Sequence, residues 1–292
     1  MRIHKNLCRL TVVSILLLCL AAGHARLDRW QRATIFSVEL GESRWWREPP
    51  PGTDEYYLSL ENGDKVQAWY LPADVPDAPT VLYLHGSRWN LNSSVFRMER
   101  WSAMGYAILA IDYRGFGSSS QRLPSQASAV EDATAALREL ARRQPLPERR
   151  FVYGHSLGGA IAIAMAAQEE LPIFNGLIVE STFTRIQDMI AHSKWSHLPG
   201  LDLLVTQPFD SLSVVGRIQN PLLILHGTND SVVPPAMSNA LFRAAASGTA
   251  LRKLVHIEGG SHSNSSARSD YKMAVQDFIG QALASHLGTD PA

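Results

Sequence analysis

The amino-acid sequence predicts an α/β domain whose central, mostly parallel sheet is covered by helices on both faces. Along residues 80–285, short runs rich in apolar and β-branched residues alternate with stretches of helical spacing. This alternation is typical of parallel strands that are buried on both faces. Before these units, residues 56–72 alternate around Asn62-Gly63-Asp64, which predicts an antiparallel hairpin. The 292 residues, 46% hydrophobic and 18% charged, fit one large globular domain, and no second domain is indicated.

The first 25 residues differ from the rest of the chain. Arg2, Lys5 and Arg9 are followed by an apolar stretch over residues 10–22, and Ala25 offers a small residue for cleavage. The apolar stretch is short for a bilayer span and is typical of a signal peptide. A cleaved leader would give an exported protein, periplasmic or secreted, whereas an uncleaved one would anchor the domain to a membrane, outside the cytoplasm. Both alternatives stay open.

Both cysteines, Cys8 and Cys19, lie in this leader. The domain that follows therefore offers neither a disulfide nor a cysteine nucleophile. Basic and acidic residues number 27 each, so the formal net charge is zero and nucleic acid is not indicated as a partner. Neither the two cysteines nor any cluster of His and Asp residues has the spacing of metal ligands, so the sequence implies no metal and no cofactor.

In chain order, residues 26–53 are expected to form an irregular lead-in, and residues 54–292 the main domain. The strands expected after the hairpin cover residues 80–86, 106–113, 150–155, 176–181, 221–227 and 251–257. The expected helices cover residues 94–104, 126–143, 157–169, 184–192, 236–246 and 268–285. In such sheets ligands bind beyond the carboxyl ends of the strands, so polar residues at those ends are the candidates for function.

Residues 152–160 read VYGHSLGGA and place Ser156 between Gly154 and Gly158, after a strand and before a helix. This is the G-x-S-x-G pattern of a nucleophile elbow in the context that it requires. The glycines remove Cβ atoms that would clash in the tight turn, and the turn presents the serine hydroxyl above the sheet. The N–H of Leu157, at the start of the helix, is the first expected donor to a developing oxyanion.

A serine nucleophile needs a base, and His262 is the best placed histidine, in EGGSHSN directly after the last expected strand. Asp230 follows the penultimate strand in LHGTNDSVVPP and is the expected acid. The chain order Ser156, Asp230, His262 is typical of this kind of elbow. Glu180 and Glu258 are alternative acids. Four other downstream histidines are expected to be structural or exposed: His192, His197, His226 and His256.

The loop after the strand at residues 80–86 is expected to supply the second oxyanion donor. Gly86 lets this loop turn toward the site, and the backbone N–H of Ser87 is the expected donor. Arg88 and Trp89 follow in the chain and are candidates for substrate binding. Asp112, in IDYRGFGSSS, lies on an earlier strand than the acid requires and is expected to brace a loop.

With these motifs the chain resembles the α/β-hydrolase superfamily. The matching motifs are LHGS (84–87), DYRGFGSS (112–119), GHSLGG (154–159), ESTF (180–183), HGTNDSVVP (226–234) and GGSH (259–262). DYRGFG and STF, with the segment FDS, are similar to a branch that includes bacterial signal-anchored hydrolases and mammalian lipid and thioester hydrolases of the depalmitoylase type. The resemblance implies the α/β-hydrolase fold from about residue 56 to the end. The family usually has asparagine where this chain has Ser87, a change that keeps the backbone donor.

The resemblance also implies a lid at about residues 185–215, and here that segment is short. It offers five large apolar residues: Trp195, Leu198, Leu201, Leu203 and Leu204. We expect a small cap and a fairly open site, which suits short-to-medium acyl groups or a substrate presented at a surface.

The expected function is that of a serine hydrolase that cleaves carboxylic ester or thioester bonds through an acyl-enzyme. Its substrate would be a small-molecule ester or thioester, or a lipid-like compound, and membrane association through the N-terminus is left open. One alternative is an aminopeptidase-like enzyme that cleaves amides with the same residues. Another is a catalytically silent domain that serves as a binding module, because a fold alone does not guarantee activity.

Overall fold

The computed structural model describes residues 2–39, 41–193, 195–197 and 200–286. At its centre lies an eight-stranded sheet in the order β1-β2-β4-β3-β5-β6-β7-β8. The strands are β1 (Asp54–Ser59), β2 (Lys65–Leu71), β3 (Thr80–Leu84), β4 (Ala107–Asp112), β5 (Arg150–His155), β6 (Gly176–Glu180), β7 (Leu222–Gly227) and β8 (Arg252–Ile257). β2 pairs antiparallel with β1 and with β4, and all other neighbours run parallel. The predicted fold class is therefore confirmed.

The helices of the described residues begin and end close to their predicted positions, except at the N-terminus and in the segment at 185–215. They are α1 (Arg2–Phe36), α2 (Leu91–Ser102), α3 (Gln126–Arg143), α4 (Leu157–Ala166), α5 (Ile186–Ala191), α6 (Ser211–Val214), α7 (Ala236–Ala244) and α8 (Ser269–His286). The sharp start of α3 has a local cause. The Ser125 hydroxyl accepts the N–H of Ser128, while the Ser128 hydroxyl accepts the N–H of Ser125. These bonds satisfy backbone groups that the helix itself leaves unpaired.

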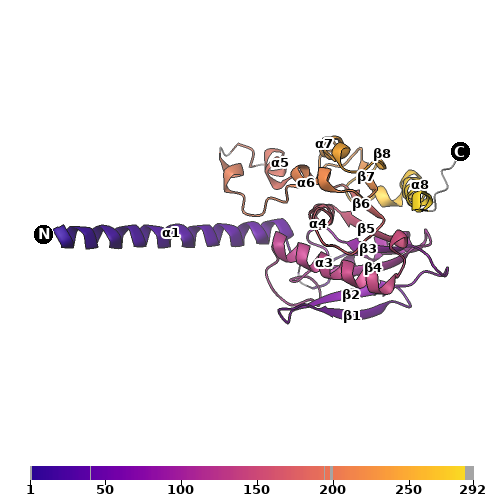
Figure 1. Cartoon of the computed structure of the whole chain (residues 1–292), viewed down its shortest axis with the longest axis horizontal. Coiled ribbons are helices and arrows are strands. Elements are labelled where there is room, and N and C mark those ends of the chain that lie inside the picture. Colours follow the sequence, from indigo (N-terminus) through magenta and orange to yellow (C-terminus); the bar gives the residue numbers. More distant parts are fainter. Residues whose placement is uncertain (1, 40, 194, 198–199, 287–292) are drawn as a thin grey trace.

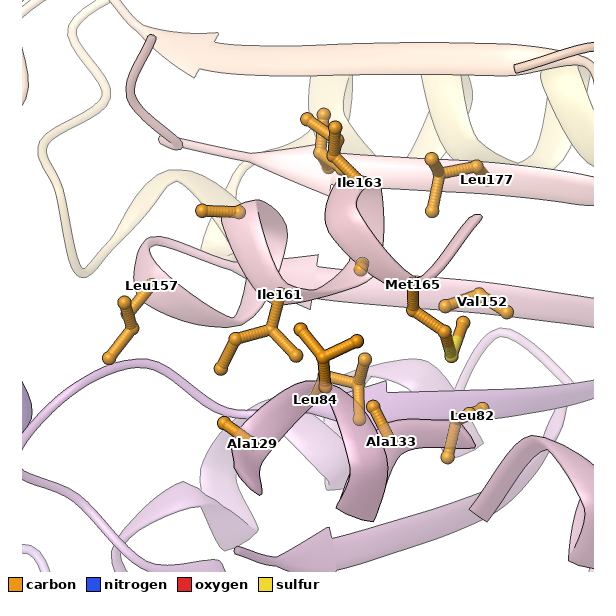
Figure 2. Close-up of a cluster of buried hydrophobic side chains, with 14 of the residues drawn as sticks. Leu82, Leu84, Ala129, Ala133, Val152, Leu157, Ile161, Ile163, Met165 and Leu177 are labelled. Carbon is orange, nitrogen blue, oxygen red and sulfur yellow. The ribbon is translucent and has the colours of Figure 1, made fainter. Parts of the chain in front are cut away.

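The helices cover both faces of the sheet (Figure 1). α3, α4 and α7 pack on one face, and α2 and α8 pack on the other. Because successive side chains of a strand point to opposite faces, β3 contributes Leu82 and Leu84 to the first layer and Val81 and Tyr83 to the second. Figure 2 shows the two leucines among apolar side chains of α3 and α4. With both faces buried, the loops at the carboxyl ends of the strands are left to form the site.

The N-terminal helix differs from the expectation, because residues 26–36 are helical rather than irregular. α1 continues to Phe36 and projects far from the body of the molecule (Figure 1). Its last turns contact the domain: the amide of Gln31 donates to the carbonyl of Leu204 at 2.7 Å, and Arg32 Nε donates to the carbonyl of Pro124 at 2.8 Å. Phe36 is completely buried. These long-range contacts stabilise a helix for which the sequence carries no strong local signal.

The apolar part of the leader lies on the projecting portion of α1. Large apolar side chains from Ile15 to Leu20 are exposed, and so is Cys19, whereas the side chain of Cys8 lies outside the described part of the chain. In the portion that the structure describes, no helix combines the length and the apolar character that crossing a membrane would need.

The segment at 185–215 contains short elements only. α5 and α6 are joined through a 3-10 turn, Leu201–Leu204, and Figure 1 shows the segment on the side of the molecule from which α1 projects. Trp195, Leu203 and Leu204 are exposed, whereas Leu198 lies outside the described residues. Whether this segment acts as a cap over the site stays a prediction.

Candidate active site

The turn between β5 and α4 holds Ser156 in a strained backbone conformation. Ser156 has a φ of 54° and a ψ of −119°, outside the regions that non-glycine residues favour. A Cβ on Gly154 would lie 2.3 Å from the carbonyl oxygen of Gly158, and a Cβ on Gly158 would lie 2.1 Å from that of Leu84. Both positions therefore require glycine, and the tight turn that they allow brings the serine to the carboxyl edge of the sheet.

The end of β6 stabilises this turn. The N–H of Ser156 donates to the carbonyl of Glu180 at 2.8 Å, and the hydroxyl of Thr182 donates to the carbonyl of Ser156 at 2.8 Å. A strained backbone conformation costs about 1–3 kcal/mol and persists where the surroundings hold it in place. The strand beside the elbow thus fixes the serine before any substrate binds.

Three of the predicted site residues come from different loops and lie in one line of hydrogen bonds. The Ser156 Oγ lies 3.1 Å from Nε2 of His262, and Nδ1 of His262 lies 2.9 Å from Oδ2 of Asp230. When Nδ1 carries the proton and donates it to the carboxylate, Nε2 is left as the acceptor for the serine proton. The Asp230 side chain is fully buried, whereas His262 keeps some access to solvent. This geometry allows proton transfer from the serine to the imidazole.

Asp230 is held as an anion by its surroundings. Its Oδ1 accepts the backbone N–H groups of Val232 and Val233, each at 2.9 Å. Nε2 of the buried His226 lies 3.3 Å from Oδ2. Burial by itself would raise the pKa of Asp230, but hydrogen bonds from His226, His262 and the Val233 backbone together hold that pKa well below its usual value. The carboxylate therefore stays charged at neutral and mildly acidic pH.

His226 is a neighbour of the acid that the sequence analysis did not identify as part of the site. Its Nδ1 contacts the hydroxyl of Ser238, and its Nε2 lies 2.9 Å from the carbonyl of Val233. The Nε2 proton can therefore point to the loop that carries Asp230. Its position four residues before Asp230, in HGTND, is the one sequence signal that could have suggested this contact.

The first predicted oxyanion donor lies where a helix leaves N–H groups free. Leu157 is the first residue of α4, directly after Ser156. The first N–H groups of a helix have no partner within the helix and lie at its positive end. The Leu157 N–H is therefore available to an anion next to the serine.

The second predicted donor lies on the loop that follows β3. This loop runs beside the serine, since a Cβ on Gly86 would lie 3.3 Å from the Cβ of Ser156. The N–H of Arg88 donates to the carbonyl of Phe36 at 2.8 Å and is not free for an oxyanion. Among the described residues, the N–H of Ser87 has no such partner. The Ser87 N–H is therefore free of the kind of bond that occupies the N–H of Arg88, and its role as an oxyanion donor stays a prediction.

Arg88 itself faces solvent at the rim of this loop. Its backbone is left-handed, with a φ of 75°, and its Nε lies 3.3 Å from a carboxylate oxygen of Glu39. The Arg88 side chain is 61% exposed, so it can meet a ligand that reaches the rim. Its role in substrate binding stays a prediction.

Trp89 belongs to a group of three aromatic rings, here called the aromatic cluster: Trp45, Trp89 and Phe96. The ring centres lie 6.0 Å apart for Trp89 and Phe96, 6.5 Å for Trp45 and Trp89, and 6.4 Å for Trp45 and Phe96. The Arg97 guanidinium lies 5.3 Å from the Phe96 ring and also donates to the carbonyl of His262. The cluster therefore adjoins the loop of the base. Of the three residues, only Trp89 was predicted from the sequence to bind substrate. Trp45 lies more than 40 positions before it, so no local pattern links the two.

The alternative acids and Asp112 have other contacts. Glu180 is buried and accepts Arg97, whereas Glu258 is exposed, and within the described residues His262 pairs with no carboxylate except Asp230. Asp112 Oδ1 accepts the N–H of Leu91 at 2.9 Å. It therefore braces the start of α2, in the structural role expected from the sequence.

His192, His197 and His256 make no hydrogen bond with Ser156 among the described residues. His256 is exposed and lies 3.2 Å from an amide oxygen of Asn239, and His192 contacts the carbonyl of Asp188 on α5. His197 is exposed. In the described ranges, no three His, Cys, Asp or Glu side chains gather in a way that could hold a metal ion.

Comparison with known proteins shows which family the chain belongs to. The family model described as "Serine aminopeptidase, S33" matches residues 76–214. Protein bem46 of Schizosaccharomyces pombe is 30% identical over 267 residues, which are 87% of each chain. Lysophosphatidylserine lipase ABHD12 of Rattus norvegicus is 31% identical over 205 residues, which are 64% of this chain and 50% of the lipase.

A solved structure shares the fold. An esterase of Pyrococcus furiosus superposes with a TM-score of 0.65 at 18% identity, covering 84% of this chain and all of the esterase. At that identity the likeness concerns the fold alone. The similarity to bem46 over 87% of each chain and the match to the hydrolase family model carry the assignment further, and together with the fold they support hydrolase activity. The chain belongs to the α/β-hydrolase superfamily.

Proposed function

We propose that this protein is a serine hydrolase that cleaves carboxylic ester or thioester bonds through an acyl-enzyme. One observation carries the proposal: Ser156, His262 and Asp230 are joined by contacts of 3.1 Å and 2.9 Å, next to a helix N-terminus. In this proposal Ser156 is the nucleophile, His262 the general base and Asp230 the acid that orients the imidazole.

The reaction would proceed in two halves. Ser156 Oγ attacks the carbonyl carbon while its proton moves to Nε2 of His262, and the N–H groups of Leu157 and Ser87 hold the oxyanion. The tetrahedral intermediate then collapses, and the departing alcohol or thiol takes the proton from Nε2. Water next attacks the acyl-enzyme with His262 again as base, which releases the carboxylic acid and restores the serine hydroxyl.

The charge distribution suits this sequence of steps. The low pKa of Asp230 keeps a negative charge beside Nδ1 of His262, which favours the imidazolium that forms in each half-reaction. The positive end of α4 lies where negative charge develops on the substrate oxygen. Donors that are already oriented cost little reorganisation, so such a site can stabilise the transition state more than the bound ester.

The side chains around the proposed site favour a substrate that has an apolar part and a negative charge. The aromatic cluster adjoins the loop of His262 and offers ring surface to an acyl chain or a planar group. Arg44 and Arg100 lie 4.9 Å and 5.2 Å from rings of the cluster, and Arg88 is exposed beside it. Guanidinium groups on aromatic faces can meet an anionic headgroup. The named activity of the rat relative, a lysophosphatidylserine lipase, agrees with a lipid-like ester of this kind.

The leader is proposed to be a signal peptide or a membrane anchor that keeps the domain outside the cytoplasm. The contacts of α1 with the domain begin at Asp28, whose carboxylate accepts the amide of Gln207 at 2.8 Å. Cleavage after Ala25 would leave all of these contacts in place. Mass spectrometry of the protein recovered from its native compartment tests this, because an N-terminus at Arg26 indicates cleavage and an intact Met1 in the membrane fraction indicates an anchor.

A fluorophosphonate probe tests the proposed chemistry. The wild-type protein should be labelled and should hydrolyse a chromogenic acyl ester, whereas Ser156→Ala should do neither. The matched control is Ser118→Ala, an exposed serine on another loop, which should behave as wild type. Labelling that persists in Ser156→Ala would overturn the assignment of the nucleophile.

The second candidate is a peptidase, which the family description as a serine aminopeptidase favours. The same three residues can cleave amides, so geometry alone does not separate the two activities. Acyl esters and aminoacyl amides compared at equal concentration do separate them. A larger kcat/KM for the amides would replace the esterase proposal with the peptidase.

A further inference from the structure

A buried ion pair lies behind the loop of His262. The side chain of Arg97, on α2, is 1% exposed, and that of Glu180, at the end of β6, is 0% exposed. Arg97 Nη1 donates to Glu180 Oε1 at 3.0 Å. The other carboxylate oxygen of Glu180 accepts the hydroxyls of Tyr153, on β5, and Tyr271, on α8, the latter at 3.0 Å. The carboxylate is therefore anchored to the sheet and to α8 at once.

The second half of the same guanidinium holds the loop of the base. Arg97 Nη2 donates to the carbonyl of His262 at 3.3 Å and to that of Ser263 at 3.2 Å. Nη1 also lies 3.3 Å from the hydroxyl of Ser266. One planar group thus connects a rigid carboxylate in the sheet to three points of the loop 262–266.

His155, the residue before the nucleophile, adds a second support. Its Nε2 lies 2.8 Å from the carbonyl of His262 and 3.1 Å from Arg97 Nη2. A carbonyl oxygen only accepts hydrogen bonds, so the His155 tautomer with its proton on Nε2 is the one that bonds the carbonyl of His262. The Arg97 guanidinium only donates, so it bonds the same carbonyl and not the protonated Nε2. Burial lowers the pKa of His155, and the charge of Arg97 lowers it further, so this imidazole is neutral. The elbow and the ion pair therefore hold the same carbonyl.

We infer that Arg97, with Glu180 as its counter-charge, is a positioning residue that sets the His262 imidazole against Ser156. The inference rests on the proposed function, in which His262 is the general base. Arg97 touches neither the imidazole nor the serine hydroxyl, and it acts through the backbone of the loop. Neither residue belongs to the line of contacts from Ser156 to Asp230.

The chemistry of the pair explains why arginine is needed. A guanidinium has donors on both sides of a rigid plane, so it can bond a carboxylate and two carbonyls at fixed distances. A lysine ammonium keeps the charge but is a single point on a flexible stem. In Arg97→Lys the charge of Glu180 stays compensated, while the loop loses most of its donors. Removing both charges together, in Arg97→Met with Glu180→Gln, also avoids leaving a buried charge unpaired.

The experiment compares Arg97→Lys, the double variant Arg97→Met/Glu180→Gln and the control Arg114→Lys. Arg114 is also buried and paired with a buried carboxylate, Asp132, at 2.7 Å, but its partners lie away from the loop of His262. For each variant, kcat and KM on a chromogenic acyl ester, the rate of fluorophosphonate labelling and the thermal midpoint are measured.

Arg97→Lys should lower kcat and the labelling rate together by about 10- to 100-fold, as expected for a displaced base, with KM changed by less than about threefold. The double variant should keep a thermal midpoint near that of Arg97→Lys and the same low kcat. Arg114→Lys should lower the midpoint and leave kcat within about twofold.

Three negative results would contradict these expectations, and they differ in meaning. A wild-type protein that the probe does not label overturns the proposed function and the inference with it. If the probe labels the wild-type protein but Arg97→Lys and the double variant keep the wild-type kcat, the inference alone is overturned. A kcat that falls only in proportion to the folded fraction, in the Arg97 variants as in Arg114→Lys, also overturns it, because the pair would then serve stability only.

Discussion

The backbone N–H of Arg88 donates to the carbonyl of Phe36 at 2.8 Å, so the last residue of the projecting helix α1 holds the loop that carries Ser87, the proposed second oxyanion donor. The Phe36 side chain secures this junction. It is fully buried, and its ring centre lies 5.9 Å from Phe209 and 6.4 Å from Phe116. The N-terminal helix is therefore part of the structure that forms the site.

We expect Phe36→Ala to lower the free energy of unfolding by about 3–5 kcal/mol, because it leaves a cavity in the core. The measurement is urea unfolding of the full chain. Trp30→Ala, at an exposed tryptophan of the same helix, is the matched control and should change stability by about 0.5 kcal/mol or less. Equal effects of the two substitutions would show that the end of α1 is not docked.

The acid is tested by Asp230→Asn, which keeps the shape of the side chain and removes its charge. The amide can stabilise the wrong tautomer of His262, so kcat should fall by about 10³- to 10⁴-fold with KM little changed. Glu258→Gln, at an exposed carboxylate next to the same loop, should stay within about twofold. A larger loss in Glu258→Gln than in Asp230→Asn would assign the acid to Glu258.

Stability should depend on pH through His155. Its pKa in the folded chain lies well below the usual value of 6.5 because of burial and the charges of Arg97 and His262. The unfolded chain therefore binds a proton there that the folded chain does not. The stabilising contribution is complete above about pH 6.5 and is lost as the pH falls below it, by up to about 1.4 kcal/mol per pH unit.

His155→Gln should flatten this part of the pH dependence, since glutamine keeps a donor and does not titrate. Unfolding in urea at several pH values between about 7.5 and 5 measures the slope. His256→Gln, at an exposed histidine, is the control. An unchanged slope in His155→Gln would mean that another group causes the loss of stability at low pH.

The elbow requires glycine at position 158. A Cβ there would lie 2.1 Å from the carbonyl oxygen of Leu84 and 2.5 Å from that of His85, so Gly158→Ala should prevent folding or cost more than about 3 kcal/mol. Gly280→Ala, on the exposed side of α8 with nothing within 4 Å of the added Cβ, should instead stabilise by about 0.5–1 kcal/mol. Thermal unfolding distinguishes them, and a stable Gly158→Ala would contradict the close approach of α4 to β3.

The aromatic cluster should affect binding more than chemistry. Trp89→Ala removes a ring that contacts both Trp45 and Phe96, and KM for an apolar ester should rise by about tenfold while kcat changes little. Trp30→Ala again serves as the control for loss of an exposed tryptophan. A fall in kcat at constant KM would place Trp89 in the loop that supports the oxyanion donors rather than at the substrate.

Elements with a local signal could be predicted from the sequence alone. The strand at 150–155 and the helix at 126–143 were predicted with the boundaries that the structure has, because apolar periodicity and end residues are properties of neighbouring positions. The elbow around Ser156 is of the same kind. Its glycines are needed by a turn that five consecutive residues define.

The helix to Phe36 could not be predicted in this way. The bonds that hold its end join Gln31 and Arg32 to residues 173 and 91–92 positions further along the chain. The same holds for Trp45 in the aromatic cluster, and for Arg97, which reaches Glu180 across 83 positions and the loop of His262 across 165. No local pattern records a contact at such separations.

The sequence by itself determined the fold class, the order of the strands and helices along the chain, and the three residues proposed for catalysis, because each depends on short motifs at the ends of strands. Only the tertiary structure decided which groups hold those three residues in place. Arg97 holds the loop of His262, and the carbonyl of Phe36 holds the backbone of Arg88, through hydrogen bonds between distant segments. His226 lies only four positions before Asp230, but its contact with the acid depends on how the chain turns after β7. Such contacts exist only once the chain has folded, because folding brings these segments together.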